Sequence, residues 1–317
     1  MRKGTNPAKF VAHVEKPQRI TVAVLNYIPF MSGFYAQTLD VLKTCLGTIW
    51  ENTDLPYDLL VFDNGSCQEA IDFLTDAQDE GRIQYLMLSE KNMGKGGAWN
   101  MMLKAAPGEI IAYADNDVFF YPGWLSKSVQ LLEHFPKVGM VTSRPYRTDP
   151  ASYSSTVRWA EETPGVTLER GKFLSFEDFA AFEMSLGATE EIARMRYNAS
   201  EDVRLTYEGL TVQAGASHWQ FTGYKSVIEE FLPFSMDRPM RQVKQLDQRM
   251  NEAGYLRLMP TEILAQNISN RLDWIHKPEQ APQKAPPAGW QKKMLQQPLV
   301  KRVLLGVYDR IFRMYYE

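Results

Sequence analysis

Residues 20–143 alternate between short apolar segments and longer amphipathic ones, and this alternation restricts the chain to one class of fold. The apolar segments mostly run into Gly, Asn, Asp or Ser, which is typical of strands; they are 20–26, 57–66, 82–90, 109–115 and 137–143. Helical spacing predicts helices between them, at about 35–51, 68–80, 91–106 and 122–135. Short connections favour βαβ units, so the expected fold is α/β with a mainly parallel sheet flanked by helices.

The rest of the chain is less regular. Residues 144–210 are polar, aromatic and charged, with helical pieces near 175–196, and we interpret them as an inserted lid segment that contacts substrate. Beyond this insertion, the pattern predicts a strand over 210–221, helices near 223–232 and 239–253, and short strands over 255–260 and 261–268. The proline-rich segment 278–289 predicts an extended linker.

A C-terminal amphipathic tail follows the linker over 298–317. Its apolar residues can share one face of a helix that also carries basic residues; they are Val303, Leu304, Val307, Ile311 and Met314. Such a helix can make peripheral contact with a membrane. Docking onto its own domain or onto a second subunit explains the pattern equally well, because amphipathicity alone does not identify the partner.

Charge and cysteine content exclude several classes of protein. A formal net charge of -3 argues against nucleic-acid binding, which needs a strongly basic surface. The two cysteines are too few for a disulfide framework and fit a reducing compartment. Residues 1–19 lack the apolar core of a signal peptide, and no apolar run approaches the roughly 20 residues that cross a bilayer. We therefore expect a cytoplasmic protein that, if it contacts a membrane, lies on its inner face.

Three polar clusters stand at the C-terminal ends of predicted strands. They are Asn26-Tyr27, Asp63-Asn64-Gly65-Ser66 and Asp115-Asn116-Asp117. In an open parallel sheet these strand ends line the crevice where ligands bind. The second cluster alone also suits a simple turn, since Asp, Asn and Gly are common turn residues. Three clusters along one edge of the sheet favour a ligand site.

A glycine-rich segment, KNMGKGGAWN over 91–100, adds to this edge. Gly94, Gly96 and Gly97 allow the backbone to approach a ligand closely, and Lys95 offers a cation beside the N-terminus of the next helix. This combination suits a phosphate. The segment is not a Walker loop, because GxxxxGK[ST] is absent, and it matches GxGxxG poorly.

The pair Asp115 and Asp117 needs a partner, because a desolvated carboxylate costs several kcal/mol when it is unpaired. Mg²⁺ and Mn²⁺ take oxygen ligands from one or two carboxylates and from substrate phosphates. Beside a phosphate-binding loop, the pair therefore predicts a divalent cation site. A turn or helix-capping pair of Asp residues is the alternative interpretation.

The motifs VLNY, VFDNGS, NMGKGGAWN and DND followed by WL occur in this order and together resemble the family 2 glycosyltransferases of GT-A fold. The resemblance covers roughly 20–143, with a second match from LDQRM to AQNISN near 246–267; the segment 144–210 and both tails lie outside it. It implies a Rossmann-like mixed, mainly parallel sheet of GT-A type. For the whole chain we expect four parts: a polar extension over 1–19, a nucleotide-sugar-binding half over 20–143, an acceptor-binding half with the insertion over 144–275, and the linker and C-terminal helix over 276–317.

The resemblance also implies roles for matching residues. Asp63 would contact the nucleotide base, and Asp115 the ribose or base side. Asp117, with Asp115 beside it, would hold Mn²⁺ or Mg²⁺ bridging the diphosphate of a nucleotide-diphosphate sugar. Further candidates for binding this donor are Asn26, Tyr27, Asn64, Asn92, Gly94, Lys95 and Asn116.

Inverting members of the family need a base near the acceptor hydroxyl, usually from a Glu-Asp pair before A-G-Y. This sequence has Gln242-Val243 at those positions. Asp247, about one helical turn further on, is the first candidate for the base, and Asp237 in the preceding loop is the second. Glu201-Asp202 looks like the family pair but lies too early in the chain, so we interpret it as a decoy.

A second departure concerns the metal. Where the family often has a histidine ligand, this sequence has Asn267, whose amide oxygen can ligate Mg²⁺ or Mn²⁺ more weakly. His218 is expected to be a strand residue facing the acceptor pocket rather than a ligand. Trp219, Phe221 and Trp124 either form a platform that stacks on a sugar or belong to the core.

The combined interpretation is an inverting, metal-dependent glycosyltransferase of the kind that serves polysaccharide biosynthesis. Its acceptor would be a glycan or a lipid-linked sugar, and the basic tail favours the latter. The alternative is a non-catalytic nucleotide-sugar-binding module, suggested by the missing Glu-Asp pair and histidine. A nucleotidyltransferase is disfavoured, because VLNYIPFMSG lacks the glycine-rich loop with Arg and Lys which that class needs.

Overall fold

A computed structural model of the chain describes residues 4–237 and 244–272. The linker and C-terminal helix expected over 276–317 lie outside these residues, and so does the start of the helix expected over 239–253. Within the described ranges no helix is both long and apolar enough to cross a bilayer. In the described part of the N-terminal extension, a short 3-10 helix spans Pro7–Phe10.

Strands and helices alternate through the first half, as the sequence predicts. The strands are β1 Ile20–Asn26, β2 Asp58–Asp63, β3 Tyr85–Leu88, β4 Ile110–Asp115, β5 Val118–Phe120, β6 Val138–Val141, β7 Thr167–Gly171, β8 Asp202–Tyr207, β9 Leu210–Ala214, β10 Gln220–Tyr224, β11 Leu256–Met259 and β12 Ala265–Asn267. The α-helices are α1 Thr38–Asn52, α2 Gln68–Asp79, α3 Gly94–Ala105, α4 Trp124–His134, α5 Ser154–Glu162, α6 Phe176–Ser185, α7 Glu190–Ala199, α8 Lys225–Glu229 and α9 Lys244–Glu252.

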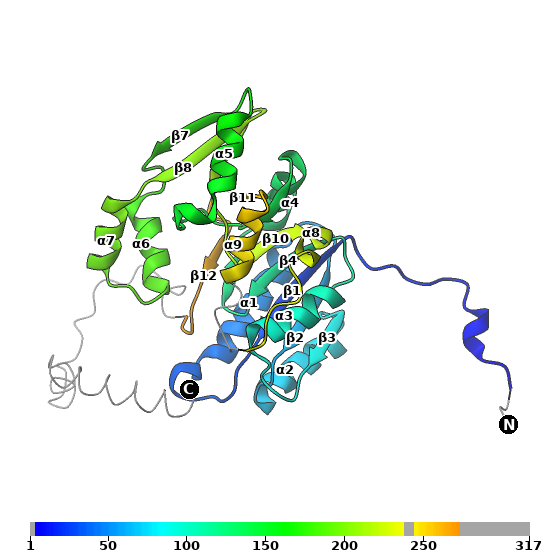
Figure 1. Cartoon of the computed structure of the whole chain (residues 1–317). Helices are drawn as coiled ribbons and strands as arrows, with labels where there is room; N and C mark the ends of the chain where they lie inside the picture. Colours follow the sequence, from blue (N-terminus) through cyan, green and yellow to red (C-terminus); the bar gives the residue numbers. More distant parts are fainter. Residues whose placement is uncertain (1–3, 238–243, 273–317) are drawn as a thin grey trace, which may run out of the picture. The chain divides into compact units, whose positions relative to one another are not determined.

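Ten strands form one mixed sheet in the order β3-β2-β1-β4-β10-β6-β11-β9-β8-β7 (Figure 1). The pairs within β3-β2-β1-β4 are parallel, and so is β6-β11. All other neighbours in this sheet are antiparallel, because β10 enters in reverse between β4 and β6, and β9, β8 and β7 continue the sheet in antiparallel pairs. The sheet is α/β and mixed as expected, but parallel pairing dominates only its first part.

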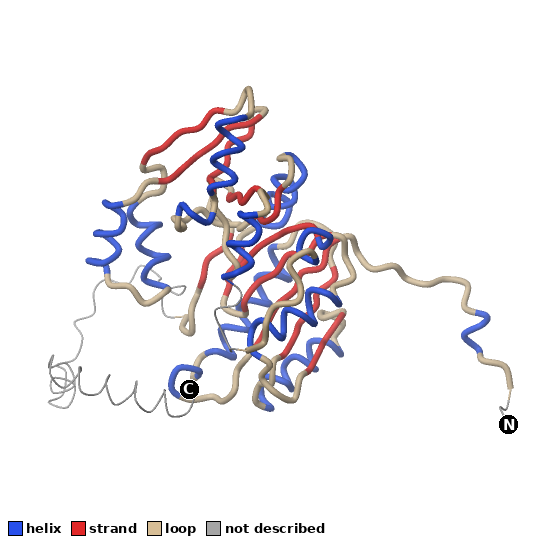
Figure 2. Tube along the Cα trace, in the orientation of Figure 1, coloured by secondary structure: helices blue, strands red, loops and turns tan. Residues whose placement is uncertain are grey.

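Helices cover both faces of the parallel part of the sheet (Figure 2). Along β1, Val22 and Val24 pack into the cluster that contains α1, α2 and α4, whereas Ala23 and Leu25 pack into the cluster that contains α3, α8 and α9. A strand covered on both faces has no solvent-facing side, which explains why these segments read as continuous apolar runs. At their carboxyl ends, β1, β2 and β4 carry the polar residues Asn26, Asp63 and Asp115.

The segment 144–210 is more regular than expected. It contains α5, β7, α6, α7 and β8, and β7 and β8 extend the sheet. Asp202, half of the suspected decoy pair, is fully buried: it accepts hydrogen bonds from Arg147 Nε (2.8 Å) and from the backbone amides of Phe173 (2.8 Å) and Leu174 (2.9 Å). Its carboxylate therefore joins the start of β8 to the loops at Arg147 and Phe173, within the segment 144–210.

Residues 210–221 form two strands, β9 and β10, rather than the one predicted. Gly215 lies between them with a φ of +128°, a conformation that favours glycine. Ser217 and Gln220 then pair as an isolated bridge, so His218 and Trp219 form a tight turn just before β10. The expectation that His218 is a strand residue is therefore wrong.

The short strand β5 was not predicted. It pairs antiparallel with β12, which places Asn267 opposite Val118, directly after the DND motif. Three-residue strands carry too little periodicity to be recognised. Through this pairing the end of the described chain returns to the polar edge of the sheet.

Candidate active site

Asn26, at the end of β1, connects the three polar clusters. Its Nδ2 donates to Asp63 Oδ1 (2.8 Å) and Ser66 Oγ (3.0 Å), and its Oδ1 accepts from Asn116 Nδ2 (2.7 Å). Asn26 and Asp63 have no exposed surface. The structure thus brings together side chains that the sequence placed at the ends of three separate strands.

Asp63 is satisfied entirely within the protein. Besides the bond from Asn26, its Oδ2 accepts the backbone amides of Gly65 (3.2 Å) and Ser66 (2.9 Å). Gly65 has a φ of +89°. The carboxylate therefore organises the turn after β2, and its expected contact with a nucleotide base stays a prediction.

The glycine-rich segment is fastened to this turn by two amides. Asn64 Nδ2 donates to Asn92 Oδ1 (3.0 Å), while Asn64 Oδ1 accepts the backbone amide of Met93 (2.9 Å). Asn92 Oδ1 also accepts the amide of Gly94 (2.7 Å), where α3 begins. Asn64, Asn92 and Gly94, three predicted binding residues, therefore shape the loop that would face a ligand.

Asp115 already has a cation as its partner. Lys95 Nζ lies 2.7 Å from both of its carboxylate oxygens, and the Tyr113 hydroxyl donates a short hydrogen bond to Oδ1. The Lys95 ammonium also lies 5.4 Å from the centre of the Trp99 ring. Burial, followed by the charge of Asp115, raises the pKa of Tyr113 well above its ordinary value, so this phenol stays a donor.

Asp117, unlike Asp115, has no cation as a partner among the described residues. Its Oδ1 is buried and has no hydrogen-bond partner among residues 4–237 and 244–272. Burial, and next the negative charge of Asp115, raise the pKa of Asp117 to about 7, while Lys95 acts in the opposite direction. The backbone holds it in place, since the Asp117 carbonyl accepts the amide of Ile268 (2.7 Å).

The residues around Asp117 fit a divalent cation that takes many of its ligands from a substrate. The unpaired Asp117 oxygen offers one carboxylate ligand, and β12 brings the amide side chain of Asn267 to the same turn. Within the described residues, no group of three or more His, Cys, Asp and Glu side chains could hold a metal alone. Mg²⁺ and Mn²⁺ commonly combine one or two carboxylates with water and substrate phosphates, so this sparse set suffices.

A small cavity of about 90 Å³ opens beside the motif. It is lined by Tyr27, Phe34, Tyr35, Thr38, Val41, Asn116, Asp117, Ser269 and Asn270. The Tyr27 and Tyr35 rings meet edge to face, with centres 6.3 Å apart. Aromatic walls and a polar floor suit a base and ribose better than an extended sugar chain.

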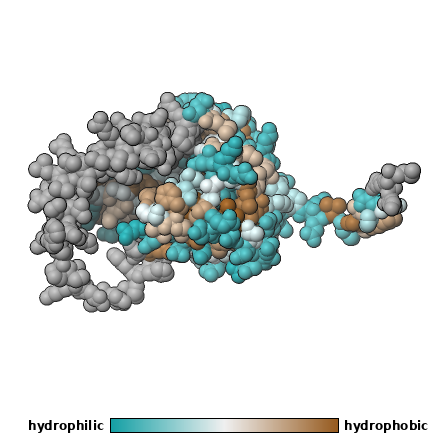
Figure 3. Space-filling view, turned by 90° about the horizontal axis from the view of Figure 1, so that it is seen from below, coloured by the Kyte–Doolittle hydropathy of each residue, from teal (hydrophilic) through white to brown (hydrophobic). Residues whose placement is uncertain are grey.

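Exposed apolar side chains surround the mouth of this cavity and occur elsewhere on the surface. In the loop after β1, Phe30 and Phe34 are exposed. The N-terminal extension carries Phe10, Val11 and Val14, which are also exposed. Figure 3 shows apolar residues scattered among hydrophilic ones on the face that is visible there. These side chains do not form the polar site itself.

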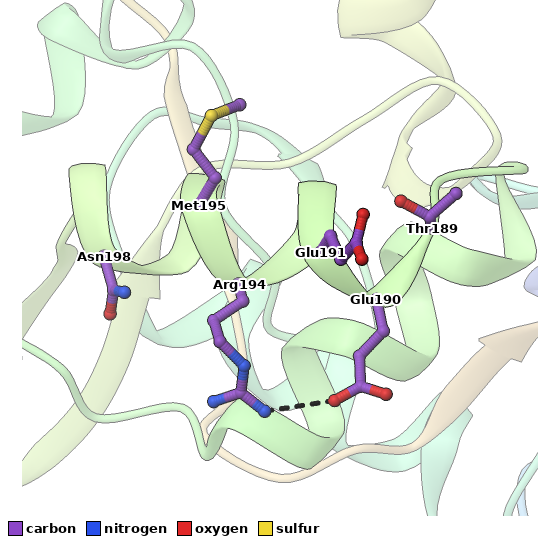
Figure 4. A pocket seen from close by; sticks show the side chains of 6 residues that line it. All are labelled: Thr189, Glu190, Glu191, Arg194, Met195 and Asn198. Atoms are coloured by element: carbon purple, nitrogen blue, oxygen red, sulfur yellow. Dashed lines mark hydrogen bonds and ion pairs between the residues drawn. The ribbon is translucent and has the colours of Figure 1, made fainter.

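A larger hollow, of about 760 Å³, lies along α7 (Figure 4). Its polar lining includes Glu190 and Arg194, which form an ion pair at 3.1 Å with both side chains more than half exposed. None of the residues predicted for the site lines it. The hollow is an exposed surface along one helix and contains none of the polar clusters at the strand ends, so the strand ends are the better candidate for the active site.

A second polar group lies close to the DND motif. The carboxylate of Asp247, in the first turn of α9, accepts from Arg257 Nη2 (2.5 Å) and meets His218 Nδ1 (2.6 Å). Asp237, the other candidate base, is exposed and accepts a hydrogen bond from the Ser235 hydroxyl. The structure therefore joins Asp247 to two residues that the sequence did not connect with it.

The aromatic residues divide between core and site. Phe221 and Trp124 are fully buried; Phe221 stacks on Tyr113 and Trp124 packs against Phe120, so of the two alternatives the core placement holds for both. Trp219 is only partly buried and packs near Tyr146. No sequence signal singled out Arg257 or Tyr146, because each reads as an ordinary residue of an apolar or irregular segment.

Comparisons with known proteins identify the family of the domain that carries this site. Residues 34–184 match the family model described as glycosyl transferase family 2, which therefore extends past residue 143 into the inserted segment. An uncharacterized glycosyltransferase from Nostoc sp. is 26% identical over 123 residues, which are 39% of this chain and 35% of the relative. Another, from Rickettsia bellii, is 26% identical over 96 residues, or 30% of this chain and 13% of the relative. The chain thus spans about a third or less of these relatives' length.

Solved structures with a similar arrangement include two glycosyltransferases. One is a mannosyltransferase from Pyrobaculum calidifontis in complex with GDP-Man and Mn²⁺, with a TM-score of 0.47 and 17% identity over 79% of this chain and 56% of that one. The other is TarS from S. aureus in complex with UDP-GlcNAc, with a TM-score of 0.45 and 13% identity over 77% of this chain and 56% of that one.

Proposed function

Since the chain belongs to glycosyl transferase family 2 through its domain at residues 34–184, we propose that it transfers a sugar from a nucleotide-diphosphate sugar to an acceptor hydroxyl. The observation that carries the proposal is the network at the strand ends. Asn26 joins the turn after β2 to the DND motif, and Asp117 beside it presents a buried carboxylate oxygen that lacks a partner. A buried carboxylate oxygen without a partner is stabilised by a bound cation, and a nucleotide-diphosphate sugar would bind together with a divalent cation.

Each part of the network has a distinct task in this proposal. The aromatic cavity at Tyr27 receives the base and ribose, and the loop held by Asn64 and Asn92 faces the diphosphate. Lys95 holds the Asp115 carboxylate in position. Mn²⁺ or Mg²⁺, bound at Asp117 with Asn267 beside it, would offset the charge that develops on the leaving diphosphate.

The finer features of the reaction are part of the same proposal. Transfer with inversion needs a base at the acceptor hydroxyl, with Asp247 as first candidate and Asp237 as second. The acceptor is a glycan or a lipid-linked sugar. Peripheral membrane contact through 298–317 is tested with anionic liposomes: deletion of residues 290–317 should weaken their binding, and equal binding would reject the contact.

Calorimetry tests the donor site directly. A panel of nucleoside diphosphates is titrated into the protein with Mn²⁺ or with chelator, using wild type, Asp117→Asn, and Asp79→Asn as the matched control at the exposed end of α2. We expect metal-dependent binding of one nucleotide, lost only in Asp117→Asn. If wild type binds none of the panel, the proposed function is wrong.

The alternative of a binding module without turnover is favoured by one observation, since both oxygens of Asp247 are engaged within the protein. Release of nucleoside diphosphate from a bound nucleotide sugar separates the two functions. Binding without release, with water or with glycan acceptors, would support the module.

A further inference from the structure

Three elements bring an imidazole, a carboxylate and a guanidinium together. His218 comes from the turn before β10, Asp247 from α9 and Arg257 from β11 (Figure 1). Asp247 Oδ2 lies 2.6 Å from His218 Nδ1, and Asp247 Oδ1 lies 2.5 Å from Arg257 Nη2. Their side chains are 20%, 14% and 1% exposed, respectively, so only the imidazole and the carboxylate retain access to solvent.

Both carboxylate oxygens of Asp247 already have partners within the protein. The Arg257 guanidinium, which is charged at all relevant pH values, also donates to the backbone carbonyls of Ser152 and Ala216 and is therefore fixed. One carboxylate oxygen is neutralised by this cation, and the other is occupied by the imidazole. A carboxylate so placed stabilises positive charge on its neighbour instead of taking a proton itself.

The contact between His218 Nδ1 and Asp247 also determines which nitrogen of the neutral imidazole carries the hydrogen. An ionised carboxylate only accepts hydrogen bonds, so Nδ1 carries the hydrogen and the lone pair of a neutral ring lies on Nε2. Within residues 4–237 and 244–272, Nε2 makes no hydrogen bond. An imidazole oriented by a carboxylate through Nδ1 is the arrangement that general bases use in hydrolases of unrelated folds.

The backbone at His218 lies close to the DND motif. β10 pairs antiparallel with β4, with Gln220 opposite Ala114. The carbonyl of Trp219 accepts the backbone amide of Asp115 (2.9 Å), so His218 is one residue from the backbone of the DND motif. Asp247, by contrast, reaches this edge only through its imidazole partner.

Buried polar side chains also surround the carboxylate and the guanidinium. Tyr146 is 5% exposed, the side chains of Ser217 and Trp219 lie near its hydroxyl, and the charges of Asp247 and Arg257 both reach it. A polar lining of this kind suits a ligand rich in hydroxyl groups.

We propose that His218 is the base of the transfer reaction and that Asp247 is a positioning residue; this inference rests on the proposed function. The acceptor O–H gives its proton to Nε2, and the acceptor oxygen forms a bond to the anomeric carbon of the donor. The bond from that carbon to the diphosphate oxygen breaks, and its electron pair leaves with the nucleoside diphosphate. The resulting imidazolium is stabilised by Asp247, while Arg257 holds the carboxylate.

The test uses the full chain, a panel of UDP-, GDP- and dTDP-linked sugars with Mn²⁺, and water as the acceptor. We expect His218→Ala to lower the release of nucleoside diphosphate by about 10²–10³-fold, as loss of a general base does, with nucleotide affinity within about twofold of wild type. Added imidazole should raise the rate of His218→Ala by about tenfold or more and should leave the other variants unchanged. His134→Ala is the control, because that ring bonds to the Tyr207 carbonyl on the far side of α4 from this turn.

The pH profile and a double variant separate the roles of the two residues. The wild-type rate should fall at low pH, where histidine takes a proton, and His218→Gln should lose this dependence. Asp247→Asn should reduce the rate of nucleoside diphosphate release less than His218→Ala does. In the His218→Ala background it should cause little further loss, because the two residues act together in the same step. Tyr146 and Arg257, the other polar groups facing the imidazole, stay intact in these variants.

The outcomes are distinguishable. If wild type binds a nucleotide and His218→Ala keeps the wild-type rate, this inference fails and the proposed function stands. A large further loss from Asp247→Asn in the His218→Ala background would make Asp247 the base and overturn the inference. Loss of nucleotide binding in both His218→Ala and His218→Gln would reduce His218 to a structural role. Absence of nucleotide binding in wild type rejects the proposed function itself.

Discussion

Asp117→Asn should stabilise the metal-free protein at neutral and alkaline pH while abolishing metal-dependent nucleotide binding. The Asp117 carboxylate is buried next to Asp115, and its Oδ1 has no partner in the described residues. An amide of the same shape removes the charge without leaving a cavity. The unpaired negative charge of Asp117 therefore lowers the stability of the metal-free protein.

The magnitude follows from the raised pKa. Burial, and then Asp115, move the pKa of Asp117 from an ordinary value of 3.8 to about 7, which corresponds to about 4 kcal/mol. Because the folded carboxyl binds its proton more tightly than the unfolded one, this group lowers the free energy of unfolding as pH rises from about 4 to about 7. Above that window the loss is complete. Asp117→Asn should not show this loss. The difference in the free energy of unfolding between the variant and wild type should therefore grow from about pH 4 to about pH 7 and then stay constant.

Urea unfolding of both proteins in chelator, at intervals between about pH 4 and pH 9, measures the difference. Other titrating groups are common to the two chains and cancel in the comparison. Asp79→Asn, which changes the net charge equally on an exposed helix end, should show a difference that does not change with pH. Parallel curves for wild type and Asp117→Asn would refute the reasoning, since they would mean that Asp117 is not held in a charge-excluding environment.

Three further predictions concern the loops and the ion pairs. Gly65→Ala should reduce nucleotide binding and thermal stability, because its Cβ would lie 3.0 Å from the backbone of the glycine-rich loop at a φ of +89°. Gly81→Ala, at a φ of +76° with open space around it, should lose only stability, by about 1–2 kcal/mol. Arg147→Met leaves the buried Asp202 carboxylate without its cation and should cost about 3–5 kcal/mol in urea unfolding. Lys95→Met should weaken nucleoside diphosphate binding by about tenfold or more in calorimetry, which is about 1.4 kcal/mol.

Each of these has a clear contrary result. Equal nucleotide affinity in Gly65→Ala and Gly81→Ala would show that the turn after β2 can shift without disturbing the site. A stability loss below about 1 kcal/mol for Arg147→Met would mean that Asp202 is solvated or neutral. Unchanged nucleotide binding in Lys95→Met would remove Lys95 from the donor site and leave it only the task of balancing Asp115.

The fold of the first half was predictable because its strands are buried on both faces. Runs such as 20–26 and 109–115 are apolar throughout and end in polar turns, so their type and order were read correctly. The second half was harder. Its edge strands β7 and β8 are short and partly exposed, and the single run 210–221 concealed a turn at Gly215 whose conformation no periodicity reveals.

The sequence predicted those site residues that directly follow strands. It did not predict side-chain contacts between elements that are distant along the chain. Asn26, Asp63 and Asn116 meet as their strand-end positions imply. That Lys95 pairs with Asp115 could not be read from the sequence, since the side chain could equally have pointed to solvent. The contact of Asp247 with His218 joins residues 29 apart on different elements, and only the three-dimensional path of the chain decides it.

The pairing of β5 with β12 has a consequence for the order of folding. It joins Tyr121 to Gln266, 145 positions along the chain, and it carries Asn267 to the DND turn. Contacts between such distant parts form late, because closing a long loop costs entropy before the contact repays it. The parallel strands can assemble while synthesis continues, but the proposed cation site is completed only by the chain beyond residue 265. Under the proposed function, a nascent chain that stops short of β12 lacks Asn267 beside the DND turn and should not bind a nucleotide together with its metal.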